Sequence, residues 1–168
     1  MNNAQMEKAG EFAKVVQLAE QLGLRIVAMD ANRPWGGFLV LDEAQAGTFA
    51  AHFFPEVPAG EILTGQKLSP KLLLVAPGQR LSWQYHFRRA EIWKVVQGPI
   101  AVCISPDDQE TPAQTFEEGN IIRLSQGERH RLVGKEKWGI VAEIWQHTDP
   151  AHPSDESDIV RLQDDYGR

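Results

Sequence analysis

Short apolar segments, repeatedly separated by glycine and proline, are the feature that most constrains how this chain of 168 residues folds. The candidate strands are Phe38–Leu41, Leu72–Val75, Ser82–His86, Glu91–Val96, Ile100–Ser105, Asn120–Leu124, His130–Val133 and Gly139–Trp145. Many short strands with turn residues between them predict a β-sandwich or barrel. No second long helical pattern interrupts them, which argues against a parallel α/β fold.

One helical pattern precedes the strands. Its apolar residues recur at three- and four-residue spacing, at Phe12, Val15, Val16, Ala19 and Leu22. Gly23 follows where glycine often ends a helix, so we expect a helix over Gln5 to Leu22. The predicted organisation is a helical extension over residues 1–25 and a β-barrel domain over residues 26–168. The polar tail returns to the body at Asp158–Leu162 as an edge strand or short helix.

The net charge and the lack of a signal or membrane-spanning segment limit the partners and the location expected for this chain. With 17 Lys and Arg against 23 Asp and Glu, the net charge is −6, which argues against broad binding to nucleic acid or anionic membranes. A small anionic ligand needs only a local basic pocket. Residues 1–10 hold no apolar signal region and the longest apolar run, Leu72–Ala76, is too short to span a membrane. We therefore expect a cytoplasmic protein.

A single cysteine, Cys103, excludes an internal disulfide and a zinc site built from several thiolates. Its neighbours Val102 and Ile104 are apolar, so we expect a buried, inert thiol in a chain suited to a reducing compartment.

The side chains most suited to chemistry surround the third candidate strand. Strand alternation puts Gln84 and His86 on one face, and a turn at residues 87–90 would bring Glu91 back beside them. Imidazole, amide and carboxylate donors suit a divalent ion such as Zn, Fe, Mn, Co or Ni, and His130 can supply a fourth donor. Either histidine taken alone would more often be structural.

Together with nearby glycines, these residues resemble the two motifs of the cupin superfamily. The first motif is matched by Gly78, Gln84-Tyr85-His86, Glu91 and Gly98, and the second by Gly119, Ser125-Gln126-Gly127 and His130. Gln84 stands where cupins usually have histidine, and Ser125 where they have proline. The resemblance implies an all-β fold, a double-stranded β-helix or jelly-roll barrel, with the N-terminal α-helix added.

A closer resemblance is to the C-terminal cupin domain of type II mannose-6-phosphate isomerases. It extends from Arg33 to the last residue, except for a poorly matched stretch over residues 44–69. The matching segments are Arg33-Pro34-Trp35-Gly36, Lys71, Gln84, His86, Arg89-Ala90-Glu91, Trp93, His130-Arg131-Leu132, Asp158–Arg161, Asp164-Asp165 and Tyr166–Arg168. Larger members of that family carry an N-terminal nucleotidyltransferase with a glycine-rich phosphate loop. This chain has no such motif, so we expect a stand-alone cupin that does not make nucleotide sugars by itself.

The resemblance implies a metal-dependent sugar-phosphate aldose–ketose isomerase of the mannose-6-phosphate isomerase type. One divalent ion, with zinc favoured and Ni, Co, Mn or Fe as alternatives, would bind Gln84, His86, Glu91 and His130 and act as a Lewis acid. Arg89 would be catalytic or orient the substrate; the alternative is a salt bridge at the barrel mouth.

The other expected roles come from the residues themselves. Glu143 shares a face with Val141 and Trp145, and if that face points into the barrel, burial would raise its pKa toward that of a general base. The alternative is a rim carboxylate paired with arginine. Phosphate recognition is assigned to Lys71, Arg80 and Arg161, with Arg129 and Arg131 as further candidates.

Two other functions remain open, because one fold hosts many activities. They are a non-catalytic cupin that binds a sugar or sugar phosphate, and a metal-dependent cupin oxygenase. The expected partners are a small-molecule sugar phosphate and a second copy of the chain, with no nucleic acid or membrane. Small cupins often cover an open sheet edge by pairing, and apolar strands such as Leu72–Val75 and the extra helix favour a homodimer. Trp83, which alternates away from Gln84, is placed outside the barrel at a subunit contact.

Overall fold

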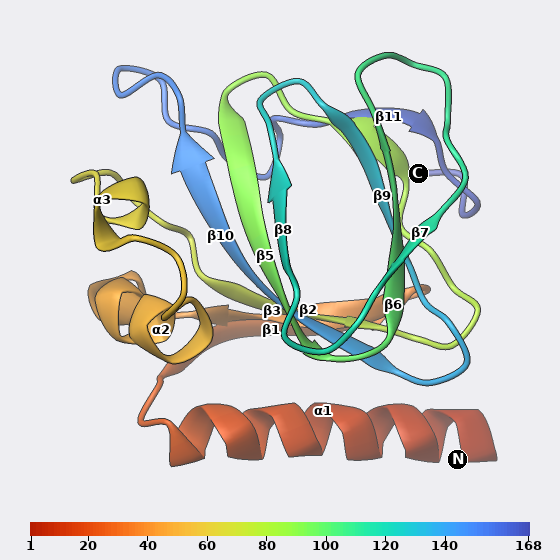
Figure 1. Ribbon diagram of the computed structural model, residues 1–168. Helices are drawn as coiled ribbons and strands as arrows, with labels where there is room; N and C mark the ends of the chain where they lie inside the picture. The colour runs from red at the N-terminus through yellow and green to blue at the C-terminus, as the bar shows by residue number, and fades with distance from the viewer.

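Two antiparallel sheets face each other across the barrel in a computed structural model that describes residues 1–168 (Figure 1). The larger sheet contains, in spatial order, β1 (Ile26–Arg33), β2 (Gly36–Leu41), β3 (Lys71–Val75), β10 (Gly139–His147), β5 (Arg89–Gln97) and β8 (Ile121–Leu124). The smaller contains β11 (Val160–Gln163), β4 (Trp83–Tyr85), β9 (Arg129–Val133), β6 (Ile100–Ser105) and β7 (Gln114–Phe116). This two-sheet jelly roll is the predicted cupin fold.

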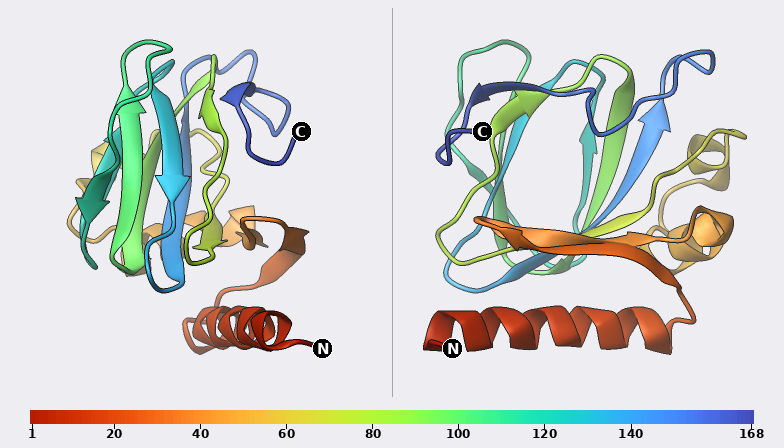
Figure 2. Two further views of the ribbon diagram at one scale, coloured as in Figure 1. Left: turned by 90° about the vertical axis from the view of Figure 1, so that its right-hand side faces the viewer. Right: turned by 180° about the vertical axis from the view of Figure 1, so that it is seen from behind.

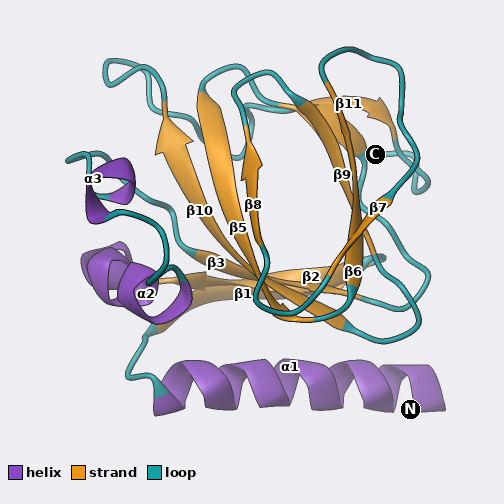
Figure 3. Cartoon of the chain, in the orientation of Figure 1, coloured by secondary structure: helices purple, strands orange, loops and turns teal.

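All eight predicted strands are present, with boundaries that differ by a few residues at most, and the tail returns as the strand β11 (Figure 3). The pattern missed β1 and β7, because most of their residues are exposed or half-buried and leave no apolar face to detect. Residues 44–69, for which we made no strand prediction, include the 3-10 helix η1 (Glu43–Gln45, beginning one residue earlier), α2 (Ala46–Phe53) and α3 (Ala59–Ile62).

The long helix α1 (Asn3–Gln21) lies close to its predicted position and has defined ends. At its start, Asn2 and Gln5 exchange backbone-to-side-chain hydrogen bonds of 2.9 Å, a capping box. At its end, Gly23 has φ +72° and its N–H donates to the Glu20 carbonyl, while Leu24 N–H donates to the Ala19 carbonyl. This is a Schellman motif, which explains why glycine follows the helix. No helix in the structure is long and apolar enough to cross a membrane.

The helix packs beneath the strands β1 and β2 (Figure 2). Its buried side chains Phe12, Val15 and Ala19 join a cluster of 21 buried residues on the outer side of the larger sheet. Gly37 on β2 permits this contact, since a Cβ there would lie 2.6 Å from Phe12 Cζ and 2.1 Å from the Asp30 carbonyl oxygen. Only glycine therefore fits at position 37, because the helix approaches the sheet so closely there.

The core has a second cluster of 10 buried residues inside the barrel. On β3, Leu72 and Leu74 belong to the outer cluster and Leu73 and Val75 to the inner one, as strand alternation requires. Since β3 pairs with β2 and β10 on its two sides, it offers no edge to a second subunit.

The expected position of Trp83 also needs correction. Its side chain is buried, at 2% exposed, and its indole Nε1 donates to the Asp108 carbonyl at 3.0 Å. The chain's own loop therefore covers it, and it is not available for a subunit contact.

The shared core makes the helix part of the folding unit. Phe12→Ala should lower the free energy of unfolding by about 3–5 kcal/mol, because it removes a buried aromatic side chain. Gln17→Ala, at an exposed position of the same helix, should change it by less than about 0.5 kcal/mol. Urea denaturation of the two variants measures both values. Equal stability would show that the barrel does not depend on the helix contact.

Candidate metal centre

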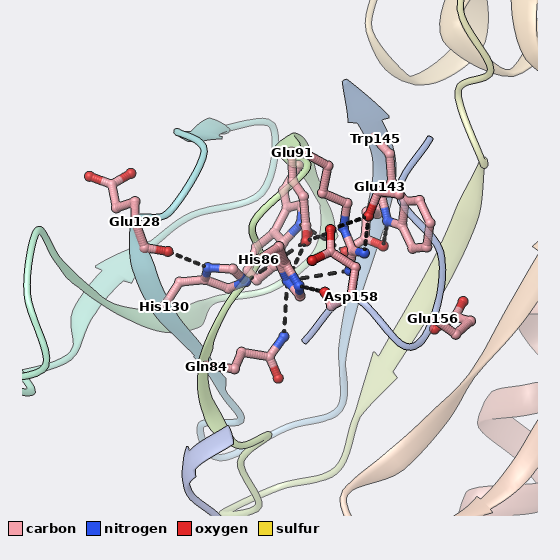
Figure 4. A network of polar contacts seen from close by, with 12 residues as sticks. Gln84, His86, Glu91, Glu128, His130, Glu143, Trp145, Glu156 and Asp158 are labelled. Atoms are coloured by element: carbon pink, nitrogen blue, oxygen red, sulfur yellow. Dashed lines mark hydrogen bonds and ion pairs between the residues drawn. The ribbon is translucent and has the colours of Figure 1, made fainter. Parts of the chain in front are cut away.

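Two histidines and a glutamate converge inside the barrel (Figure 4). His86 follows β4, Glu91 lies on β5 and His130 lies on β9, and each is 2% exposed. Each can offer one ligand atom, and the three atoms lie within 4.8 Å of one another. The two sheets therefore bring together three of the four predicted metal ligands.

Backbone carbonyls set the protonation of both imidazoles. His86 Nδ1 lies 2.7 Å from the Asp158 carbonyl oxygen, and His130 Nδ1 lies 3.1 Å from that of Glu128. Since a carbonyl only accepts hydrogen bonds, each Nδ1 carries a proton, and each Nε2 faces the centre as the atom that a metal would bind. His130 Nε2 is buried and has no hydrogen-bond partner. A buried acceptor without a partner, beside a second imidazole and a carboxylate, fits a bound divalent cation.

The charge states also suit a metal. Burial lowers the pKa of His130 to about 4, so the ring is neutral at physiological pH. Burial alone would raise the pKa of Glu91, but the imidazole of His86 and the guanidinium of Arg89 outweigh it and hold that pKa well below its usual range. Glu91 Oε1 lies 2.9 Å from His86 Nε2 and 3.9 Å from His130 Nε2. The set therefore combines the neutral imidazole of His130 with the carboxylate of Glu91 and the imidazole of His86.

Gln84 lies beside His86, but its amide is oriented with the nitrogen toward the cluster. Its amide nitrogen Nε2 lies 3.4 Å from His86 Nε2, and its oxygen accepts a hydrogen bond of 2.6 Å from Ser82 Oγ. A metal ligand would have to be that oxygen. Gln84 lines the same cavity, so its role as fourth ligand stays a prediction that requires the amide to turn.

A second buried carboxylate, Glu143 on β10, adjoins the centre. It is 6% exposed and accepts hydrogen bonds of 2.9 Å from the indole nitrogens of Trp93 and Trp145. Burial, followed by the charge of Glu91 and a hydrogen bond with it, raises the pKa of Glu143 well above its usual range. The Glu143 face of β10 therefore points into the barrel, and the carboxyl is not paired with an arginine at the rim.

Two cations flank the indole of Trp145. The guanidinium of Arg89 lies 3.7 Å from the ring centroid and the ammonium of Lys71 lies 4.4 Å from it. Arg89 is 6% exposed and donates to Glu91 Oε1 at 3.2 Å and to Ser154 Oγ at 2.9 Å. Lys71 forms an ion pair with Glu156. Arg89 therefore does make a salt bridge, and it makes it with a candidate ligand inside the cavity.

Asp158 supports the centre in a way that residue spacing did not reveal. Its carboxylate accepts backbone N–H bonds of 2.9 Å and 3.0 Å from Phe87 and Arg88, and a bond of 2.6 Å from Ser154 Oγ. Its carbonyl holds His86. The signal in the sequence was the match of the Asp158–Arg161 segment, in which we had assigned no role to Asp158.

The basic residues predicted to bind phosphate fall into two groups, those that line the cavity and those that lie elsewhere. Arg161 and Lys71 line the cavity. Arg80 does not: both its Nε and Nη2 donate to the Asp165 carboxylate, at 2.7 Å and 3.0 Å. Arg131 is fully buried against Glu110, and Arg129 stacks on Tyr85 with its guanidinium 3.8 Å from the ring centroid. Arg80, Arg129 and Arg131 are therefore left out of the candidate site.

The barrel and its buried donors define the chain as a cupin. Solved structures share this fold at low sequence identity. CapF, a capsular polysaccharide assembling protein from Staphylococcus aureus, aligns with a TM-score of 0.55 and 14% identity over 81% of this chain and 34% of its own. Vicilin from Solanum lycopersicum (tomato) aligns with a TM-score of 0.51 and 17% identity over 79% of this chain and 32% of its own.

The chain belongs to the family described as "Mannose-6-phosphate isomerase C-terminal", whose profile matches residues 58–164. A mannose-1-phosphate guanylyltransferase from Sinorhizobium fredii is 27% identical over 95% of this chain and 26% of its own length. Alginate biosynthesis protein AlgA from Pseudomonas aeruginosa is 36% identical over 83% of this chain and 23% of its own. The chain spans about a quarter of the length of these curated relatives.

The centre predicts a specific loss of metal. His130→Ala should weaken zinc binding by more than about 100-fold, since even residues that only support a ligand contribute 10–100-fold. His152→Ala is the matched control, because His152 is exposed and pairs with Asp149. Metal analysis of protein purified without chelator, followed by zinc titration, measures both. Equal zinc affinity in the two variants would contradict the site.

Proposed function

We propose that this chain is a metal-dependent sugar-phosphate isomerase of the mannose-6-phosphate type. The observation that carries the proposal is the convergence of the His86–Glu91–His130 cluster, the carboxyl of Glu143 and the guanidinium of Arg89. All five groups are buried. Membership of a family described as mannose-6-phosphate isomerase C-terminal supports the choice of substrate class.

The reaction moves a proton between neighbouring carbons of an open-chain sugar phosphate through an enediol. It needs a base for that proton, a positive environment for the oxygen that gains charge, and a hold on the phosphate. A divalent ion held by His86, Glu91 and His130 would supply Lewis acidity to the sugar oxygens. Zinc is favoured because two imidazoles and one carboxylate form one of its catalytic ligand sets; Ni, Co, Mn and Fe are the alternatives.

Glu143 is the proposed base. In its ionised form the carboxylate takes the proton from the carbon beside the carbonyl and, as the carboxylic acid, returns it to the neighbouring carbon, so that no net proton is consumed. The indole N–H groups of Trp93 and Trp145 each donate to one of its oxygens, which fixes the carboxyl plane. Position and orientation support this role, because a base must lie within hydrogen-bond reach of the proton it removes.

Arg89 and Lys71 supply the positive environment. Arg89 is held on three sides, by Glu91, Ser154 and the Trp145 ring, so its charge is positioned before the substrate arrives. Preorganised charge of this kind favours an anionic intermediate over a neutral substrate. Lys71 lies on β3, directly opposite Glu143 on the neighbouring strand β10.

A non-catalytic binding protein for sugar phosphates is the second candidate, and a cupin oxygenase the third. The buried pair Glu91 and Glu143 favours the isomerase, because a binding site gains little from a second buried carboxyl without a cation partner. The Sinorhizobium fredii relative is named for guanylyl transfer, and this chain covers 26% of its length. Coupled assays of purified protein, one for sugar-phosphate isomerisation and one for guanylyl transfer, test whether the chain has either activity.

Arg89 separates an enzyme from a metal-binding protein. Arg89→Lys should lower kcat by about two to three orders of magnitude, because a point charge cannot keep the contacts of the guanidinium fork. Metal content and thermal stability should change little. Arg123→Lys, on the outside and paired with Glu61, is the control. Isomerase kinetics with mannose 6-phosphate measure the effect, and wild-type turnover in Arg89→Lys would refute the role.

A homodimer through β1 is the proposed assembly. β1 is an edge strand of the larger sheet, and its Val27 and Met29 side chains are 55% and 54% exposed. An exposed edge with apolar side chains can pair with a second copy. Light scattering should give twice the 18.8 kDa chain mass. The double variant Val27→Lys, Met29→Lys should be monomeric, and Met6→Lys on the helix should stay dimeric. A wild-type monomer at micromolar concentration would contradict the proposal.

A further inference from the structure

Three further arginines line the cavity. Arg33 ends β1 just before the turn to β2, Arg161 lies on β11 and Arg168 in the tail, and all three line the same cavity as Glu91 and His130. The turn and the tail lie on the same side of the barrel (Figure 2). The protein as a whole has a net charge of −6, so this positive cluster is a local feature.

Strand register aims Arg161 into the cavity. Arg161 pairs with Gln84 across β11 and β4, and Gln84 pairs with His130 across β4 and β9. Residues directly opposite one another in an antiparallel sheet share a face, so the three form one inward row. Two strand spacings, about 9.5 Å, separate the backbone of Arg161 from that of His130. An open-chain sugar phosphate can extend along such a row, with its carbonyl end at the histidine and its phosphate at the arginine.

The hydrogen-bonding capacity of these arginines is incompletely used. The side chain of Arg161 makes no hydrogen bond and no ion pair within the chain. Arg168 places Nε and Nη2 on Asp164 and leaves Nη1 without a partner. Arg33 Nε lies 2.9 Å from Asp30 Oδ2 but is without a hydrogen-bond partner. These guanidinium groups therefore keep donors available for a ligand.

Trp35 adds an independent observation beside Arg33. It lines the same cavity, it is 4% exposed, and its indole Nε1–H is buried with no hydrogen-bond partner. A buried donor without an acceptor is unfavourable unless a ligand or water satisfies it. The Arg-Pro-Trp-Gly segment thus contains two buried donors without a hydrogen-bond partner, on residues that line one cavity.

The charges around Arg161 agree with this picture. Burial, and then the positive charges of Arg168 and Arg33, lower the pKa of Arg161, although Asp164 and Glu156 oppose them. Asp164 is engaged by Arg168, and Glu156 is engaged by Lys71. The three guanidinium groups are therefore close enough to repel one another, and an added anion would relieve that repulsion.

The geometry points to a phosphate clamp formed by Arg33, Arg161 and Arg168, which holds the phosphate of the substrate while its carbonyl end faces the metal ligands. Guanidinium forks match phosphate oxygens, and a phosphate group with nearly two negative charges suits three cations better than a carboxylate does. The clamp rests on the proposed function for the sugar part of the ligand, and the anion site itself can be tested without it.

The test is binding measured by titration calorimetry with inorganic phosphate, mannose 6-phosphate and mannose. Arg161→Gln and Arg168→Gln should each weaken both phosphate-containing probes by at least about tenfold, because each loses a charge-assisted hydrogen bond. Arg80→Gln is the matched control, since Arg80 is paired with Asp165 outside the cavity, and it should bind like wild type. The Arg161 side chain has no hydrogen bond or ion pair to lose, so its variant should keep the wild-type melting temperature.

The outcomes separate the clamp from the proposed activity. Unchanged phosphate affinity in Arg161→Gln and Arg168→Gln, an equal loss in Arg80→Gln, or no phosphate binding by wild type would overturn the clamp. A selective loss of phosphate binding in a protein that isomerises no sugar phosphate would support the clamp and refute the proposed function. Isomerase activity in the wild type, with an unchanged KM in Arg161→Gln, would support the proposed function and refute the clamp.

Discussion

A carboxylate kept ionised in the barrel interior is the constraint on which the rest of the structure depends. Glu91 is 2% exposed, and a buried charge is costly unless partners compensate it. His86 and Arg89 contact one of its oxygens and the Trp93 indole donates to the other. Each of these partners must itself be held in place, so the strands and loops that carry them must also be correctly packed.

The loop after β10 provides much of that support. Ser154 binds both Arg89 and the Asp158 carboxylate, while Asp158 binds His86 through its carbonyl. A segment distant in sequence from the first motif thus orients two of its members. Such supporting contacts set the direction of a ligand's lone pair and the position of a charge. They link the integrity of the candidate site to the docking of the C-terminal region.

The cavity has two electrostatic ends within an acidic protein. One end is the His86–Glu91–His130 cluster with Glu143 beside it, where a bound cation would be favoured. The other is formed by Arg33, Arg161 and Arg168, where an anion is favoured. A ligand with polar oxygens at one end and a phosphate at the other matches this division. Its phosphate would offset the positive charge of the three arginines, and its oxygens would face the candidate metal centre.

The sequence by itself determined the strands with a buried face, the helix ended by Gly23, and the candidate metal ligands His86, Glu91 and His130. Local periodicity and spacing carry that information, because alternation decides which side chains share a face. The tertiary structure decided which basic residues serve the cavity, excluding Arg80 and adding Arg33 and Arg168. It also revealed the support from Asp158 and the exposed edge strand β1. These depend on register between distant segments, such as β11 against β4, and an arginine has the same local signature whether it pairs with an aspartate outside or faces a ligand inside.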